Sequence, residues 1–212
     1  MTADVLLLSK TDFWGDQSIA LARRVFGKRL EATPCKRGAP FPWRPEDELR
    51  YRVVLSFLNA WILPGWFLDR TTVALNFHPA PPAHPGFGPY NFALYGGDTE
   101  YGVTCHHIAP RVDTGAIVAV RRFPIYRADS VATLQGRAMV ELLSLFAMIL
   151  DALAADRLPE PSGEAWALAP RRRVEFEALR RVTPDMPADE IERRRRAVTY
   201  PGFPGLTTEE MP

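Results

Sequence analysis

The chain has 212 residues, of which 47% are hydrophobic and 24% are charged, and its formal net charge is +1. This composition supports a folded core and excludes a disordered chain, while the small net charge gives no global attraction to nucleic acid or to membranes. Two cysteines, Cys35 and Cys105, provide neither a disulfide framework nor the spacing of a zinc site. We therefore expect reduced thiols in a cytoplasmic protein that binds no metal.

The N-terminal part of the chain alternates predicted strands and helices. No basic stretch precedes its first apolar run, which indicates a strand rather than a signal peptide, and no segment approaches the roughly 18 apolar residues of a membrane helix. Continuous apolar runs predict buried strands, helical spacing followed by glycine predicts a helix, and Pro/Gly-rich sequence predicts a loop. In chain order these are a strand at 5–8, a helix at 16–27, a loop at 34–47, and strands at 53–58 and 73–77.

The following segments continue this alternation. Residues 90–97 predict a helix closed by two glycines, and residues 101–108 and 115–125 predict strands. Residues 130–155 form the longest helical pattern, with Asp129 or Ser130 as its N-cap. The alternation predicts an α/β, Rossmann-like fold with a mostly parallel twisted sheet flanked by helices.

A Pro-rich stretch, "LPEPSGE", divides the chain into two predicted parts. We expect a catalytic domain over residues 1–158 and a C-terminal helical, Pro/Gly-rich extension over residues 159–212. The extension is expected to hold one amphipathic helix. Its basic runs, at Arg171–Arg173 and Arg193–Arg196, are typical of a solvated helix face.

Two polar residues, Asn76 and His78, end the predicted strand at 73–77, and Pro79 follows directly. Side chains alternate along a strand, so we expect Asn76 and His78 on one side and Phe77 on the other. Ligands of open α/β sheets bind beyond the carboxyl ends of the strands. An amide donor beside an imidazole can polarise a carbonyl group and move a proton, so this pair is our candidate catalytic site.

Asp113, in a predicted "DTG" turn between two strands, is the candidate third catalytic group. A carboxylate there reaches Asn76 and His78 if the strands concerned are neighbours. The alternative is an aspartate that only stabilises the turn before Gly115.

A metal site is the weaker alternative, although all four histidines fall between residues 78 and 107. His106 and His107 are adjacent on a predicted strand, so at most one of them can join a site with His78. For substrate binding, our candidates are Ser9 and Lys10, directly past the first predicted strand, and Tyr90. The alternative for Ser9 and Lys10 is a solvated loop with no ligand.

The motifs "NFHP" and "YGVTCHHIAPRVDTGAIV" resemble those of the formyltransferases that use N10-formyltetrahydrofolate. That family is marked by an Asn-x-His pair followed by an Asp in a D-x-G turn, here Asn76, His78 and Asp113. The resemblance implies that Asn76 and His78 stabilise the oxyanion and that Asp113 orients His78. It also implies that Ile62, Leu63, Pro64 and the loop around Asp113 hold the pterin of the folate co-substrate.

The stretch "HPAPPAHPGFGPYNFALYGG" replaces the Ser-Leu-Leu-Pro sequence of commoner family members. It resembles bacterial enzymes that act on nucleotide-linked 4-amino-4,6-dideoxy sugars used in O-antigen synthesis. The first strand also lacks the Gly-rich turn that binds phosphate in the purine enzyme, which argues against glycinamide ribonucleotide as the acceptor. The resemblance thus implies formyl transfer to the amino group of a nucleotide sugar, with no nucleic-acid or membrane partner.

Two other functions stay open at this point. A hydrolase would use the same three residues to release formate, with water in place of the amine. A partnered domain that formylates a carrier-bound amino acid or another amine would suit the basic run at Arg193–Arg196. A homodimer is also left open.

Overall fold

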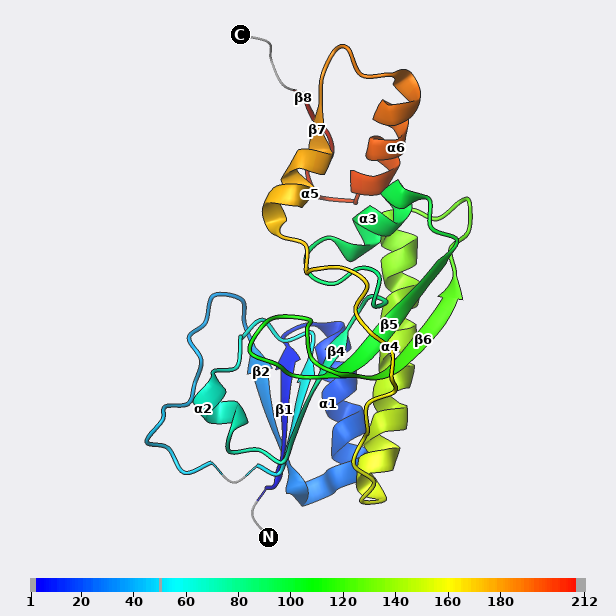
Figure 1. Ribbon diagram of the computed structural model, residues 1–212. Coiled ribbons are helices and arrows are strands. Elements are labelled where there is room, and N and C mark those ends of the chain that lie inside the picture. The colour runs from blue at the N-terminus through cyan, green and yellow to red at the C-terminus, as the bar shows by residue number, and fades with distance from the viewer. Residues whose placement is uncertain (1–2, 50, 209–212) are drawn as a thin grey trace.

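The computed structural model describes residues 3–49 and 51–208, and its centre is a six-stranded sheet in the order β2-β1-β3-β4-β5-β6 (Figure 1). The first four strands in this order are parallel to one another. β5 pairs antiparallel with β4, and β6 pairs antiparallel with β5. The strands are β1 Val5–Lys10, β2 Leu30–Cys35, β3 Val53–Phe57, β4 Val73–His78, β5 Glu100–His107, β6 Ile117–Pro124, β7 Arg181–Val182 and β8 Thr207–Thr208. The helices are α1 Phe13–Phe26, α2 Gly65–Leu68, α3 Pro89–Gly96, α4 Val131–Ala154, α5 Arg173–Arg180 and α6 Ala188–Val198, with a 3-10 turn at Gly27–Arg29.

The central strands are buried on both faces, which explains their continuous apolar sequences. Val5 and Leu7 of β1 face one hydrophobic cluster, while Leu6 and Leu8 face a second cluster on the opposite side of the sheet. The predicted α/β class and mostly parallel sheet are therefore confirmed.

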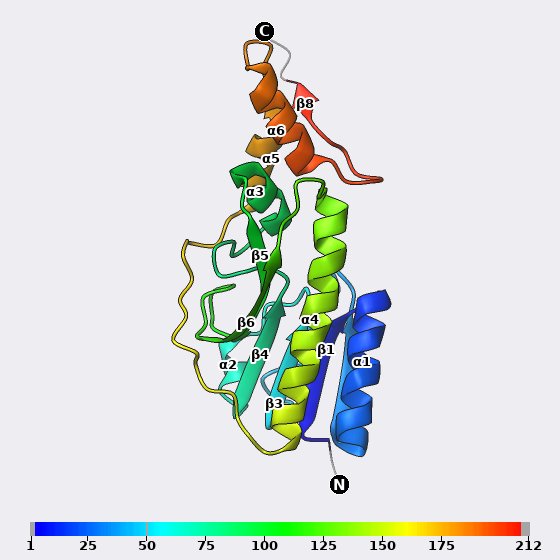
Figure 2. The ribbon, with the colours of Figure 1, turned by 90° about the vertical axis from the view of Figure 1, so that its right-hand side faces the viewer.

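Helices α1 and α4 cover one face of the sheet, as Figure 2 shows edge-on. Phe146 of α4 packs edge-on against Phe57 and Phe77, with ring centroids 5.1 and 4.8 Å apart. The expected N-cap Ser130 is confirmed, since its hydroxyl accepts the Thr133 N–H. Side chains of α2 and of the neighbouring loops pack on the second cluster, on the other face.

The sequence patterns predict no strand at β2, since they indicate nothing for residues 30–33 and a loop from residue 34 on. Its sequence, LEATPC, has neither a continuous apolar run nor a clear alternation, and only Cys35 is buried. β2 lies at the edge of the sheet and pairs with β1 on one side only. Tertiary pairing rather than a local pattern forms this strand.

The C-terminal segment holds two helices, so the expectation of one amphipathic helix was wrong. Helices α5 and α6 stand beyond α3 with the short parallel pair β7–β8 (Figure 1). Asn91 of α3 donates its side-chain N–H to the carbonyl of Ala197, and Ala197 is fully buried in the main hydrophobic cluster. Helix α6, "ADEIERRRRAV", buries only Ala197 and Val198, both in its last turn.

No helix within residues 3–49 and 51–208 combines the length and the apolar character needed to cross a membrane.

The connection from β5 to β6, residues 108–116, is a loop that contains a turn at Asp113. Asp113 adopts a left-handed backbone conformation, with φ of 50°, which aspartate tolerates better than most residues. A Cβ atom on Gly115 would lie 1.7 Å from the carbonyl oxygen of His107. The turn therefore requires glycine at this position, and that close approach brings Asp113 back toward the sheet.

We expect Gly115→Ala to lower the free energy of unfolding by more than about 2 kcal/mol, because the new methyl group must displace the turn. Gly205→Ala is the matched control, since a Cβ there meets nothing within 4 Å. Urea denaturation of both variants measures the difference. Equal midpoints for the two variants would contradict this account of the turn.

Candidate active site

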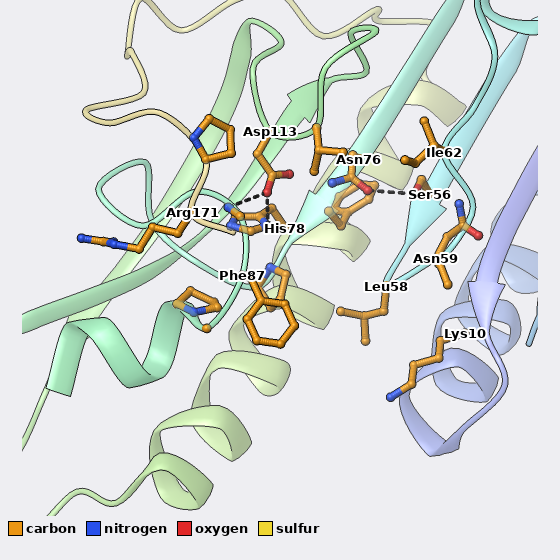
Figure 3. A pocket seen from close by; sticks show the side chains of 18 of the residues that line it. Lys10, Ser56, Leu58, Asn59, Ile62, Asn76, His78, Phe87, Asp113 and Arg171 are labelled. Atoms are coloured by element: carbon orange, nitrogen blue, oxygen red, sulfur yellow. Dashed lines mark hydrogen bonds and ion pairs between the residues drawn. The ribbon is translucent and has the colours of Figure 1, made fainter. Parts of the chain in front are cut away.

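A pocket of about 1050 Å³ opens beyond the carboxyl ends of β3 and β4, where the sequence placed the candidate site. Asn76, His78 and Asp113 all line it, so the structure brings the three predicted catalytic residues together (Figure 3). The volume lies at the upper end of the range for a pocket that holds one small molecule.

Asn76 is held by residues of both neighbouring strands. In the sheet register, Asn76 lies opposite Ser56 of β3 and opposite His106 of β5. The Ser56 hydroxyl donates to Asn76 Oδ1 at 2.8 Å, and Asn76 Nδ2 lies 3.1 Å from His106 Nε2. These contacts fix the orientation of the amide, and Nδ2 keeps a second hydrogen for a ligand.

Asp113 connects the other members of the site. Its Oδ2 lies 3.3 Å from His78 Nδ1 and accepts the Gly86 N–H at 2.9 Å, while its Oδ1 lies 3.5 Å from His106 Nε2. Asp113 is 5% exposed and His78 is 6% exposed, so bulk water screens their contact weakly.

Burial and charge set the protonation states of this pair. Burial opposes a charge on Asp113, but His106, His78 and the Gly86 N–H outweigh it and hold the pKa of the carboxyl below its usual value. Burial also lowers the pKa of His78, and the opposing effect of the Asp113 charge is smaller. The resting site therefore holds an ionised Asp113 beside a neutral His78.

His106 was considered in the sequence only as a metal ligand, and the structure places it between Asn76 and Asp113. Its Nδ1 donates to the carbonyl of His107 at 2.8 Å, and its Nε2 lies 3.1 Å from Asn76 Nδ2 and 3.5 Å from Asp113 Oδ1. Antiparallel pairing of β5 with β4 brings this residue to Asn76, and no local sequence signal reveals that pairing.

Not all of the predicted folate-binding residues line the pocket. Ile62 and Leu63 line it, whereas Pro64 is not among its lining residues and precedes α2 as the N-cap. Within the described residues, the peptide groups of Ile62 and Leu63 make no hydrogen bond. Asn59 fixes this loop, because its side chain bonds to both the N–H and the carbonyl of Trp61 at 3.1 and 3.0 Å.

The predicted substrate-binding residues also differ in placement. Lys10 and Tyr90 line the pocket, and the Lys10 ammonium lies 2.7 Å from Asp12. Ser9 is fully buried with its hydroxyl 2.9 Å from that of Ser18, outside the lining of the pocket. The expectation that Ser9 meets a substrate phosphate is therefore corrected, because α1 covers that side of β1.

Residues 163–172, which we call the strap, bring an unpredicted tryptophan to the catalytic residues. The indole N–H of Trp166 donates to the carbonyl of Gly115 at 2.8 Å. Its ring meets His78 and His106 edge-to-face, with centroids 5.8 and 5.0 Å apart. Nothing in the sequence near Trp166 indicates this role, since the residue lies 53 positions after Asp113.

Within residues 3–49 and 51–208, no group of three or more His, Cys, Asp or Glu side chains is arranged to hold a metal ion.

Comparison with known proteins identifies the same region. Residues 48–144 match the family described as formyl transferase. The methionyl-tRNA formyltransferase of Mycobacterium avium (strain 104) is 37% identical over 121 residues, which cover 56% of this chain and 37% of that protein. The chain thus spans well under half the length of the curated relatives it matches.

Two solved structures share the fold over most of the chain. A sugar N-formyltransferase from Shewanella sp FDAARGOS_354 superposes with a TM-score of 0.77 at 18% identity, covering 97% of this chain and 92% of that one. The N-formyltransferase from Helicobacter canadensis, solved with folinic acid and dTDP-3-aminofucose, gives 0.72 at 15% identity, with 92% and 80% covered. At these identities the likeness concerns the fold, whereas the family match rests on residues 48–144. Through residues 48–144, the chain is similar to the formyl transferase family.

Proposed function

We propose that this chain transfers a formyl group from N10-formyltetrahydrofolate to a primary amine, namely the amino group of a nucleotide-linked 4-amino-4,6-dideoxy sugar. The observation that carries the proposal is the joining of Asn76, His78 and Asp113 in one pocket. The preference for a sugar acceptor rests on the sequence after His78 and on the folds of the sugar N-formyltransferases.

The residues around the pocket fit a folate. Ile62 and Leu63 provide apolar surface beside open peptide N–H and carbonyl groups, which suits the flat, polar-edged ring of a pterin. Leu58, with φ of 53°, holds a strained conformation at the start of this loop, and the Asn59 contacts keep the loop in place.

Asn76 and His78 would act on the formyl oxygen. As the amine attacks the formyl carbon, negative charge develops on that oxygen, and the free Nδ2 hydrogen of Asn76 is placed to stabilise it. A preorganised donor of this kind is worth on the order of 10²-fold in rate. The new carbon–nitrogen bond forms as the bond to N10 breaks, so the formyl group changes nitrogen without oxidation or reduction.

His78 is suited to move the proton that the amine loses to the departing N10. Both ring nitrogens face oxygen acceptors: Nδ1 faces Asp113, and Nε2 lies 3.3 Å from the carbonyl of His84. The neutral ring can therefore take a second proton for a short time, and the carboxylate of Asp113 stabilises the resulting charge. Asp113 in this account orients His78 and stays ionised.

We expect His78→Ala to lower kcat by about 10²-fold or more, because the oxygen loses a stabilising group and the proton loses its carrier. The measurement is tetrahydrofolate release from N10-formyltetrahydrofolate with dTDP- and GDP-linked 4-amino-4,6-dideoxy sugars, glycinamide ribonucleotide or water alone. Release that needs a sugar supports the proposal, while equal release with water alone would identify a hydrolase. Absence of folate binding by the wild-type chain would refute the proposal.

We expect the pKa of His78 to lie below 6.5 and to fall further in Asp113→Asn. The direction follows because the carboxylate charge raises the pKa of the imidazole, and the variant removes that charge. NMR titration of the four histidines, assigned with His78→Ala, measures it. Asp98→Asn is the control, since Asp98 pairs with His84 rather than His78. A His78 pKa that is unchanged in Asp113→Asn would contradict the coupling.

Ser56→Ala should lower kcat on the order of 10-fold with little change in the KM for folate, because Asn76 Oδ1 loses its buried donor and the amide can rotate. Ser144→Ala is the matched control, since its hydroxyl bonds to the Val140 carbonyl on the exposed side of α4. Steady-state kinetics distinguishes the two variants. Unaltered kcat in Ser56→Ala would show that Ser56 does not orient Asn76.

A further inference from the structure

The pocket extends to both sides of the catalytic residues. Figure 3 shows Asn59 and Ile62 on one side of Asn76 and His78, and Phe87 and Arg171 on the other. The first side is the one that we propose for the folate. The second is built from the start of α3, the first turns of α4, the end of the strap and Tyr200.

The strap is fastened along the loop that follows β4. The Ala167 and Arg171 N–H groups donate to the carbonyls of Pro82 and Pro85, both at 3.0 Å, and the carbonyl of Arg171 accepts the Phe87 N–H at 2.9 Å. Between these bonds, a Cβ atom on Gly86 would lie 2.4 Å from the Arg171 carbonyl oxygen. The loop and the strap therefore form one rigid wall.

The guanidinium of Arg171 strengthens this attachment. It lies 3.1 Å from His84 Nδ1 and 4.3 Å from the centre of the Phe92 ring. The contacts of Arg171 thus fix the end of the strap, and they thereby fix the position of Arg172 and Arg173 at the pocket.

Arg172 and Arg173 make this wall basic. Within the described residues, Arg172 has no ion pair, and the only one of Arg173 is an exposed contact of 3.5 Å with Glu177. The acidic residues of the pocket are already engaged, Asp12 by Lys10 and Asp113 by the histidines. An excess of guanidinium groups on one wall suits a phosphate, to which arginine donates two hydrogen bonds at once.

The deeper part of this side holds an unsatisfied hydroxyl. Tyr90 is 8% exposed, and its OH has no hydrogen-bond partner within the described residues. Burial raises the pKa of Tyr90, so the hydroxyl stays protonated and can donate. A buried polar group without a partner is rare and points to a ligand that provides one.

Gly136, in the second turn of α4, also lines the pocket. Glycine weakens a helix interior, yet a Cβ at Gly136 would meet nothing within 4 Å. Among the described residues, the glycine therefore leaves open space at this point of the pocket, where a ligand can lie.

We propose that this side of the pocket is the acceptor subsite and that it takes a small acceptor carrying a phosphate or diphosphate group. Arg172 and Arg173 bind the phosphate, and the Tyr90 hydroxyl donates to the sugar or base of the acceptor. The inference rests on the proposed function and names the residues and the chemical class of its second substrate. These arginines lie outside residues 48–144, the part that matches the family.

The test measures binding of dTDP and GDP by calorimetry, without folate, to the wild type and to Arg172→Ala/Arg173→Ala. We expect Kd to rise at least 10-fold in the variant and to rise with salt in the wild type. The matched control is Arg23→Ala/Arg24→Ala, an adjacent pair at the end of α1 that does not line the pocket. Equal affinities in all three proteins would overturn the proposal.

Two further variants test the deeper part. Gly136→Leu should abolish nucleotide binding, while 5-formyltetrahydrofolate still binds. Tyr90→Phe should raise the acceptor KM several-fold without lowering the melting temperature, because the hydroxyl bonds to nothing in the described residues. The proposed subsite would be overturned if Gly136→Leu bound nucleotide with unchanged affinity. It would also be overturned if Arg172→Ala/Arg173→Ala lost binding of tRNA but kept binding of nucleotide. Failure of the wild type to bind folate would instead refute the proposed function, so the two failures are distinguishable.

Discussion

The carboxylate of Asp113 is the contact on which the rest of the candidate site depends. It meets His78, His106 and the Gly86 N–H, and these come from β4, from β5 and from the loop after β4. A buried carboxylate requires such partners, because an unpaired charge in a low-dielectric site is strongly unfavourable. The left-handed turn at Asp113 and the close approach at Gly115 are the backbone conditions for placing it there.

The same contact links the site to the C-terminal part of the chain. Gly86, which donates to Asp113, is also the residue that approaches Arg171 of the strap. Trp166 adds a second link through the Gly115 carbonyl and the two imidazole rings. The division into residues 1–158 and 159–212 stays a prediction, and residues of the second part line the pocket of the first.

Much of the fold could be predicted where the local pattern is strong. The aliphatic run of β1, the N-cap of α4 and the end of β4 before Pro79 were all expected, because burial on both faces, capping and proline act within a few residues. Strand β2 was not expected, because an edge strand carries weak hydrophobic periodicity, and only one of the two C-terminal helices was expected. Ser9 was misplaced because the sequence does not show which strand residues a helix covers.

The sequence by itself determined the Asn-x-His pair on one face of a strand end, the aspartate in a glycine-closed turn, and thereby the resemblance to the formyltransferases. These features depend on alternation and turn chemistry, which are local properties. Only the tertiary structure decided that His106 and Ser56 orient Asn76, and that Trp166 and the arginines of the strap reach the same pocket. Those contacts join residues that are far apart in the sequence: Ser56 and Asn76 are 20 residues apart, and His78 and Trp166 are 88 residues apart. The strand order and the path of the strap bring them together, and no local pattern does so.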